Sequence, residues 1–186
     1  MRTFRRLTAV MTLAAVAALA AGCDPSVPGK TPAGPPATAA VSPEFNDADV
    51  TFLRTLIPHH RAGTEIARIG AERASRPELR TLAGAVVATQ QDEVARLSGW
   101  LTAWGRTAPP APAKPPQAVT TLAKTSRTAF DAAFARLLAG HQREAVRLAE
   151  AETANGRNRD ALAFARQVQA SRTAQIDALN HSLRKT

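Results

Sequence analysis

The chain has 186 residues and a net charge of +9; 45% of its residues are hydrophobic and only 4% are aromatic. This length and composition fit one globular domain with additional segments. No aromatic residues interleave with the basic ones for base stacking, and most later arginines alternate with acidic residues, so we expect no nucleic-acid partner.

Residues 1–22 have the three parts of an export signal. Arg2, Arg5 and Arg6 form a basic start, a short apolar run follows, and small residues precede Cys23. The apolar run is short for a membrane-spanning helix, which needs ~20 residues. The stretch before Cys23 resembles a bacterial lipobox, which implies cleavage before Cys23 and lipid attachment to its sulfur. We therefore expect an exported protein, anchored by lipid to the outer face of the cytoplasmic membrane or the cell envelope.

Residues 23–43 are predicted to form an extended tether. Six prolines fall within residues 24–43, and a segment of this composition cannot pack a core. From residue 44 onward the hydrophobic pattern has a helical period, and the β-branched alternating runs typical of strands are missing. The sequence therefore predicts an all-α domain over residues 44–186.

Two helical hairpins are expected within this domain. They cover residues 46–105 and 128–184, and a long proline-rich crossover over residues 106–127 joins them. Ser75-x-x-Glu78 and Thr128-x-x-Asp131 have the spacing of capping boxes at helix starts. Four helices connected in this way predict a four-helix bundle.

The two hairpins repeat at an interval of 82 residues. Residues of the same type recur at equivalent positions: Asp49 and Asp131, Phe52 and Phe134, His59 and His141, Leu97 and Leu179. This recurrence predicts an internal duplication with pseudo-twofold symmetry.

Polar residues interrupt the apolar stripes of these helices. His59 and His141 each follow a residue that weakens a helix, a proline in one half and a glycine in the other. Glu93 lies on the stripe of the second helix, and Gln175 is its equivalent in the fourth. We expect these four residues to form one central polar cluster in which His59 faces Glu93.

Two interpretations of this cluster are open. In the first, His59, His141 and Glu93, together with His60 or Gln90, bind a divalent metal such as Zn²⁺, Cu²⁺ or Fe²⁺, because imidazole and carboxylate groups are usual ligands of these ions. In the second, His59 pairs with Glu93 and His141 with Gln175, and these pairs only satisfy hydrogen bonds in the core.

The stretches FLRTLIPHHRAGTEIA and LRTLAGAVVATQQDEVARLSGWL resemble the exported, ferritin-like bacterial proteins of domain-of-unknown-function family 305. The resemblance covers residues 45–183 and implies a ferritin-like bundle in the cell envelope, with copper handling through methionine and histidine in some members. His59, His60 and Glu93 match the family pattern, whereas Gln175 stands where the family has glutamate. The only methionines, Met1 and Met11, lie in the signal, so Cu(I) binding by methionine is not expected.

Together these observations predict a non-enzymatic, lipid-anchored envelope protein that binds a divalent metal in the bundle core. The alternative is a module that binds a protein partner and has a purely structural His/Glu pair. A metal-dependent oxidoreductase is the least favoured prediction, because a di-iron bundle needs four carboxylates and two Glu-x-x-His motifs.

Overall fold

The computed structural model describes residues 41–184. The helices are α1 (Asp47–Arg73), α2 (Pro77–Ala103), α3 (Gln117–Ala123), α4 (Arg127–Asn155) and α5 (Arg159–Arg184). No strand occurs over this range, and the predicted all-α bundle is confirmed. The expected signal, Cys23 and most of the tether lie outside the described residues.

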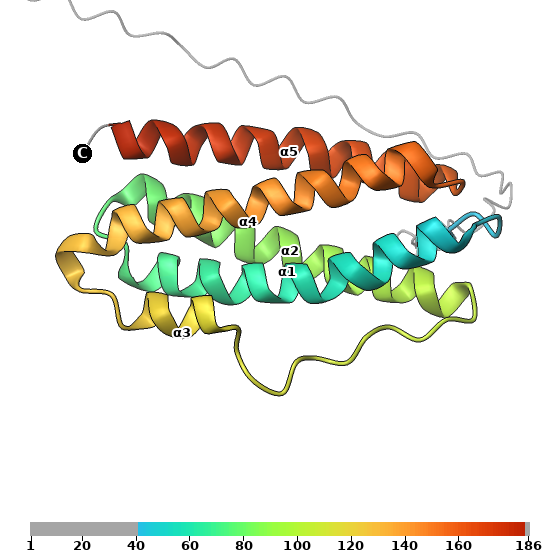
Figure 1. Ribbon diagram of the computed structural model, residues 1–186, viewed down its shortest axis with the longest axis horizontal. Coiled ribbons are helices and arrows are strands. Elements are labelled where there is room, and N and C mark those ends of the chain that lie inside the picture. The colour runs from blue at the N-terminus through green and yellow to red at the C-terminus, as the bar shows by residue number, and fades with distance from the viewer. Residues whose placement is uncertain (1–40, 185–186) are drawn as a thin grey trace, which may run out of the picture. The chain divides into compact units, whose positions relative to one another are not determined.

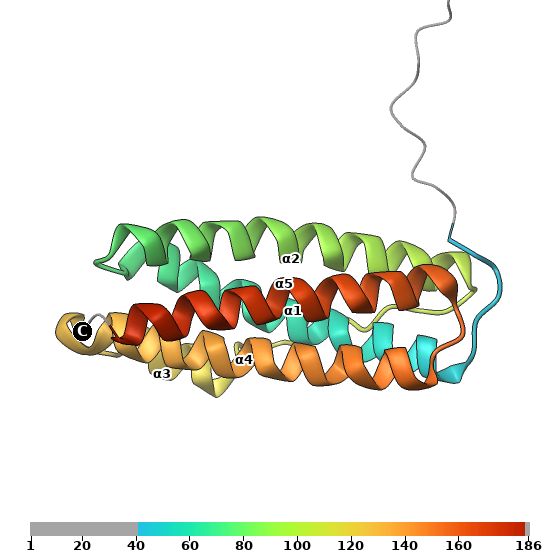
Figure 2. The same cartoon turned by 90° about the horizontal axis from the view of Figure 1, so that it is seen from above.

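The four long helices form two antiparallel hairpins, α1–α2 and α4–α5 (Figures 1 and 2). Helix α1 packs against α4 along the bundle, whereas α2 and α5 make few contacts with each other. Figure 1 shows the start of α1 and the α4–α5 loop at one end of the bundle, and the α1–α2 loop and the start of α4 at the other. None of the helices within residues 41–184 combines the length and hydrophobicity needed to cross a membrane.

The crossover contains the short helix α3, which the sequence pattern did not predict. Seven residues make only about two turns, too few to show a helical period. Val119 and Leu122 are buried and hold α3 in the same hydrophobic cluster as parts of α1 and α4. The η2 nitrogen of Arg73 donates to the main-chain oxygen of Thr125 at 2.6 Å and ties the crossover to the end of α1.

Neither of the two expected capping boxes forms. Helix α2 begins after Arg76 and α4 begins after Ser126, and neither start has a side-chain capping bond. Asp131 instead reaches across the bundle, where its carboxylate accepts from the main-chain nitrogens of Ser75 at 2.8 Å and Arg76 at 3.2 Å. The expectation was wrong because a capping spacing does not reveal that a carboxylate has a partner in another loop.

Asp49 makes the equivalent contact at the opposite end of the bundle. It closes a true capping box with Asn46 at the start of α1. Its Oδ1 also accepts from the main-chain nitrogens of Arg157 and Asn158, each at 3.0 Å. The two aspartates are 82 residues apart, and so are the loops that they bind. This exchange of contacts between the hairpins supports the predicted internal duplication.

The core consists of two hydrophobic clusters separated along the bundle axis. One is built around Phe130, Phe134, Leu138 and Leu179, and the other around Leu53, Leu56, Leu97 and Leu101. Between these clusters each long helix contributes two polar residues. They form what we call the polar layer: His59, His60, Gln90, Glu93, His141, Gln142, Arg172 and Gln175.

Candidate functional site

A buried ion pair lies at the centre of the polar layer. Glu93 on α2 accepts a hydrogen bond from the guanidinium group of Arg172 on α5. Arg172 is fully buried and Glu93 is 4% exposed. Because isolated charges are costly to bury, each group depends on the other for compensation. The pair also joins α2 to α5, the two helices that otherwise make few contacts.

His60 adds a third group to this pair. Its Nε2 atom lies 2.9 Å from Oε2 of Glu93. Burial lowers the pKa of His60 and outweighs the opposing influence of Glu93. Burial acts to raise the pKa of Glu93, but the hydrogen bond to His60 and the charge of Arg172 together hold it below its ordinary value. At neutral pH the site therefore contains an anionic Glu93, a cationic Arg172 and a neutral His60.

The structure puts His60, rather than His59, against Glu93, and the predicted His59–Glu93 contact is wrong. The two histidines are adjacent on α1, so their side chains point about 100° apart around the helix. When two adjacent residues of a helix are both polar, the sequence alone does not show which of them faces the core. His60 is completely buried, whereas His59 is partly exposed.

His59 faces His141 on α4 instead. Its Nε2 atom donates to the main-chain oxygen of His141 at 3.1 Å. The two rings stack with their centroids 3.7 Å apart and their planes within 1° of parallel. The predicted association of His59 with His141 is therefore present, but as a stacked pair beside the ion pair.

Both stacked histidines are uncharged at neutral pH. Burial lowers the pKa of His59 to about 4, and nearby His60 adds to the effect. Burial, followed by the effect of His59, lowers the pKa of His141 to about 3. Each neutral ring therefore has one unprotonated nitrogen, and on His59 this is Nδ1 because its Nε2 atom donates to His141.

Gly63 leaves the space in which His141 and Gln90 converge. A β-carbon at Gly63 would lie 2.3 Å from Oε1 of Gln90 and 2.5 Å from Nε2 of His141. Both atoms are buried and have no hydrogen-bond partner among the described residues, and the same holds for Nε2 of Gln90. Three buried polar atoms without partners are unusual, because such groups normally pair. Their convergence marks a place where a ligand atom or an ion could be held.

The second half of the duplication has a neutral counterpart of the contact between His60 and Glu93. Gln142 donates to Gln175 across α4 and α5, at the positions equivalent to His60 and Glu93. The predicted pairing of Gln175 with His141 is therefore wrong, again by one residue. The equivalent of Gln90 is Arg172, whose charge balances Glu93.

Arg172, Gln142 and Gly63 also belong to this region and were not predicted from the sequence. The 82-residue offset contained the signal for the first two, since it aligns Arg172 with Gln90 and Gln142 with His60. Gly63 gave no comparable signal, because its role depends on the side chains that α2 and α4 bring beside it.

The ligands that the polar layer could offer to a metal are mostly neutral. No group of three or more His, Cys, Asp or Glu side chains within residues 41–184 is arranged to hold an ion. The one carboxylate, Glu93, is already neutralised by Arg172. The available donors are the imidazoles of His59 and His141 and the amide oxygen of Gln90. Such a set suits a transition metal that accepts imidazole better than it suits Ca²⁺ or Mg²⁺.

Residues 49–183 match the domain of unknown function DUF305. No curated relative matches the sequence. A DUF305 fragment from Deinococcus radiodurans is similar over 76% of this chain and 98% of its own, with 18% identity and a TM-score of 0.68. CopM in a Cu(I)-bound form is similar over 74% of this chain and 96% of its own, with 24% identity and a TM-score of 0.66. A DUF305 protein from Streptomyces coelicolor shares 22% identity over 71% of this chain and 88% of its own, with a TM-score of 0.63.

Proposed function

Because the chain belongs to the DUF305 family, we propose that it is a non-enzymatic protein of the cell envelope that binds a divalent transition metal in its polar layer. The ligands in this proposal are His59, His141 and Gln90. His60 and Glu93 support them from the adjacent ion pair, and Gln175 belongs to the equivalent pair in the other half.

One observation carries the proposal. Nε2 of His141 and Oε1 of Gln90 are buried without partners and converge on the space beside Gly63. His59 stacks directly on His141, so a second imidazole lies next to this point. A bound metal would supply the missing partner for the orphaned atoms.

The donor chemistry favours Cu²⁺ or Zn²⁺. Imidazole nitrogen is a preferred ligand of both ions, and Cu²⁺ lies highest in the usual affinity order. CopM, which shares the fold, has been solved bound to Cu(I), Cu(II) and silver. In this chain Met1, Met11 and Cys23 are the only sulfur-containing residues, and all precede the bundle. A Cu(I) site built on thioethers is therefore not proposed.

Titration of the full-length protein with Cu²⁺ or Zn²⁺ tests the proposal. We expect one ion per chain bound through imidazole, with nitrogen hyperfine structure in the electron paramagnetic resonance spectrum of the Cu²⁺ form. His141→Ala and His59→Ala should each remove this site while circular dichroism shows an intact bundle. His181→Ala is the matched control, because that histidine is exposed near the end of α5. Unchanged binding in the His59 and His141 variants would refute the site.

The alternative function is a protein-interaction module with a structural polar core. The observation in its favour is that Glu93 already has Arg172 and His60 as partners and needs no metal. If this alternative holds, Glu93→Ala lowers the melting temperature sharply, and no variant of the polar layer alters metal uptake, because the wild type takes up none.

We also propose that Cys23 carries the lipid that anchors the protein at the outer face of the membrane. This proposal rests on the signal and lipobox pattern of residues 1–23. Mass spectrometry of the protein from its native membrane should find Cys23 at the mature N-terminus with its acyl groups. An unmodified Cys23, or cleavage at another position, would contradict it.

A further inference from the structure

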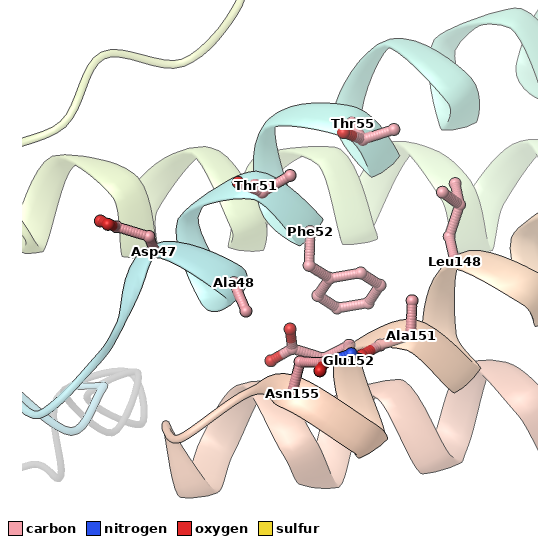
Figure 3. A pocket seen from close by; sticks show the side chains of 9 residues that line it. All are labelled: Asp47, Ala48, Thr51, Phe52, Thr55, Leu148, Ala151, Glu152 and Asn155. Atoms are coloured by element: carbon pink, nitrogen blue, oxygen red, sulfur yellow. Dashed lines mark hydrogen bonds between the residues drawn. The ribbon is translucent and has the colours of Figure 1, made fainter.

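A pocket of ≈ 370 Å³ opens between the start of α1 and the end of α4 (Figure 3). It lies at the end of the bundle opposite the α1–α2 loop, within the hydrophobic cluster that contains Phe52 rather than in the polar layer. Its size is within the range of small-molecule sites. Nine residues line it: Asp47, Ala48, Thr51, Phe52, Thr55, Leu148, Ala151, Glu152 and Asn155.

Glu152 is the polar group in this pocket that most needs a partner. It is 1% exposed, and neither of its carboxyl oxygens has a hydrogen-bond donor in the described part of the chain. In Figure 3 its side chain lies beneath the ring of Phe52, between the two helices. An acidic group buried in this way is held against a substantial desolvation cost.

Asp49 lies beside Glu152 and is itself an acid, so it can accept the proton of Glu152 but supplies no positive charge to it. Asp49 is fully buried and already accepts from the main-chain nitrogens of Asn46, Arg157 and Asn158. Burial and the neighbouring Asp49 raise the pKa of Glu152 to about 8. At neutral pH Glu152 therefore holds its proton in the folded protein.

The pocket has no basic residue in its lining, although the chain has 24 lysines and arginines. Asp47 adds a second acid at the rim. The remaining wall contains Thr51, Thr55 and Asn155, and its largest apolar members are Phe52 and Leu148. The pocket therefore combines a buried acid, without a basic partner among the lining residues, with a partly apolar surface.

We propose that this pocket binds a small organic cation that has an apolar body. An ammonium or amidinium group of the ligand pairs with the carboxyl group of Glu152, and the body packs against Phe52 and Leu148. The carboxyl oxygens of Glu152 then gain donors, and a charge-assisted hydrogen bond to the ligand replaces the proton of Glu152. This site is separate from the proposed metal ligands and does not depend on them.

Binding is coupled to a proton. The cation favours the ionised carboxylate, so the proton held by Glu152 leaves to solvent when the ligand binds. Only about a tenth of Glu152 is ionised one pH unit below its pKa, and about nine-tenths one unit above. The apparent affinity should therefore rise about tenfold between pH 7 and pH 9 if the ligand binds only the ionised form.

Benzamidinium is a suitable probe, and benzamide is its neutral counterpart of the same shape. Nuclear magnetic resonance titration of the full-length protein should show saturable shifts at Phe52 and Ala151 with benzamidinium, which stays protonated across this pH range. Benzamide should bind at least tenfold more weakly. Glu152→Gln retains an amide that can donate to Asp49, so the bundle should fold, but benzamidinium binding should weaken and lose its dependence on pH.

A second pair of variants distinguishes binding in the pocket from the general effect of an added arginine on α4. Ala151→Arg places a competing cation at the rim and should abolish binding, whereas Ala154→Arg, also exposed on α4, should leave it unchanged. Equal affinity for benzamide and benzamidinium would overturn the proposal. Unchanged binding by Glu152→Gln, or no saturable shift at the lining residues of the wild type, would do so equally.

Discussion

At the scale of single residues, the pair formed by Glu93 and Arg172 is the most consequential contact in the polar layer. Removing either partner leaves a buried charge without compensation, which typically costs about 3–5 kcal/mol. We therefore expect Glu93→Gln and Arg172→Gln each to lower the free energy of unfolding by about this amount. The double variant should recover most of the loss, because it removes both buried charges together and leaves neither without its partner.

Denaturant unfolding of the wild type, both single variants and the double variant measures this coupling directly. Additive losses in the double variant would show that the two charges do not depend on each other. They would also remove the reason to regard Arg172 as the counter-ion of Glu93.

Gly63 permits the convergence of His141 and Gln90, and a side chain there would break it. Gly63→Ala would put its β-carbon 2.3 Å from Oε1 of Gln90 and should cost about 1–3 kcal/mol through overpacking. It should also abolish metal binding at the proposed site. Gly140→Ala is the matched control, because no atom lies within 4 Å of the added carbon. That change should stabilise α4 by about 0.5–1 kcal/mol.

Calorimetric melting and Cu²⁺ titration of both glycine variants check this prediction. Loss of metal binding in Gly140→Ala, which adjoins His141 in sequence, would indicate that binding responds to helix stability rather than to the space at Gly63.

At the scale of secondary structure, the sequence predicted the four long helices well. Their apolar stripes extend over seven or more turns, so the helical period is unmistakable. The seven-residue helix α3 was missed because its identity depends on burial against α1 and α4. The one-residue error at His59 has a related cause. The phase of a stripe is set by the neighbouring helices, and those contacts are not visible along one chain.

Asp49 and Asp131 hold the hairpin loops to the opposite hairpin, but to different degrees. Asp49 is fully buried and has three main-chain donors in two segments, whereas Asp131 is partly exposed and has two. An unsatisfied buried group costs about 1–3 kcal/mol, more than an exposed one. We therefore expect Asp49→Asn to destabilise the protein at least twice as much as Asp131→Asn.

Hydrogen exchange checks the location of these effects. Asp49→Asn should speed exchange at the starts of α1 and α5, and Asp131→Asn should do so at the start of α2. Exchange that increases uniformly in both variants would show that the aspartates contribute to global stability without fastening particular loops.

At the scale of the whole molecule, the duplication explains both the symmetry of the bundle and the asymmetry of its chemistry. The two halves share their aspartate contacts and their central polar pairs. They differ at Arg172, which replaces Gln90, and at Glu152, whose equivalent is Gly70. The proposed metal site uses Gln90, and the proposed cation pocket uses Glu152. The positions at which the two duplicated halves differ therefore indicate where the proposed binding sites lie.

These buried groups give the protein a stability optimum near pH 6.5. Below that value His59 and His141 stay neutral in the folded state, with pKa values of about 4 and about 3, while the unfolded chain takes up protons at 6.5. Above it Glu152 keeps its proton up to a pKa of about 8, although the unfolded side chain loses its proton near 4.5. The unfolded state binds more protons on the acid side and fewer on the alkaline side, so stability falls in both directions.

Each proton by which the folded and unfolded states differ changes the free energy of unfolding by about 1.4 kcal/mol per pH unit. Glu152→Gln should therefore abolish the decline between pH 6.5 and pH 8, because the amide has no proton to lose. It should also steepen the fall in stability between pH 6.5 and pH 4.5, where the proton held by Glu152 in the wild type offsets part of the histidine effect. Urea unfolding at half-unit pH intervals measures both slopes. If the alkaline decline persists in Glu152→Gln, another group is responsible for it, and Glu152 is already ionised in the folded protein at neutral pH.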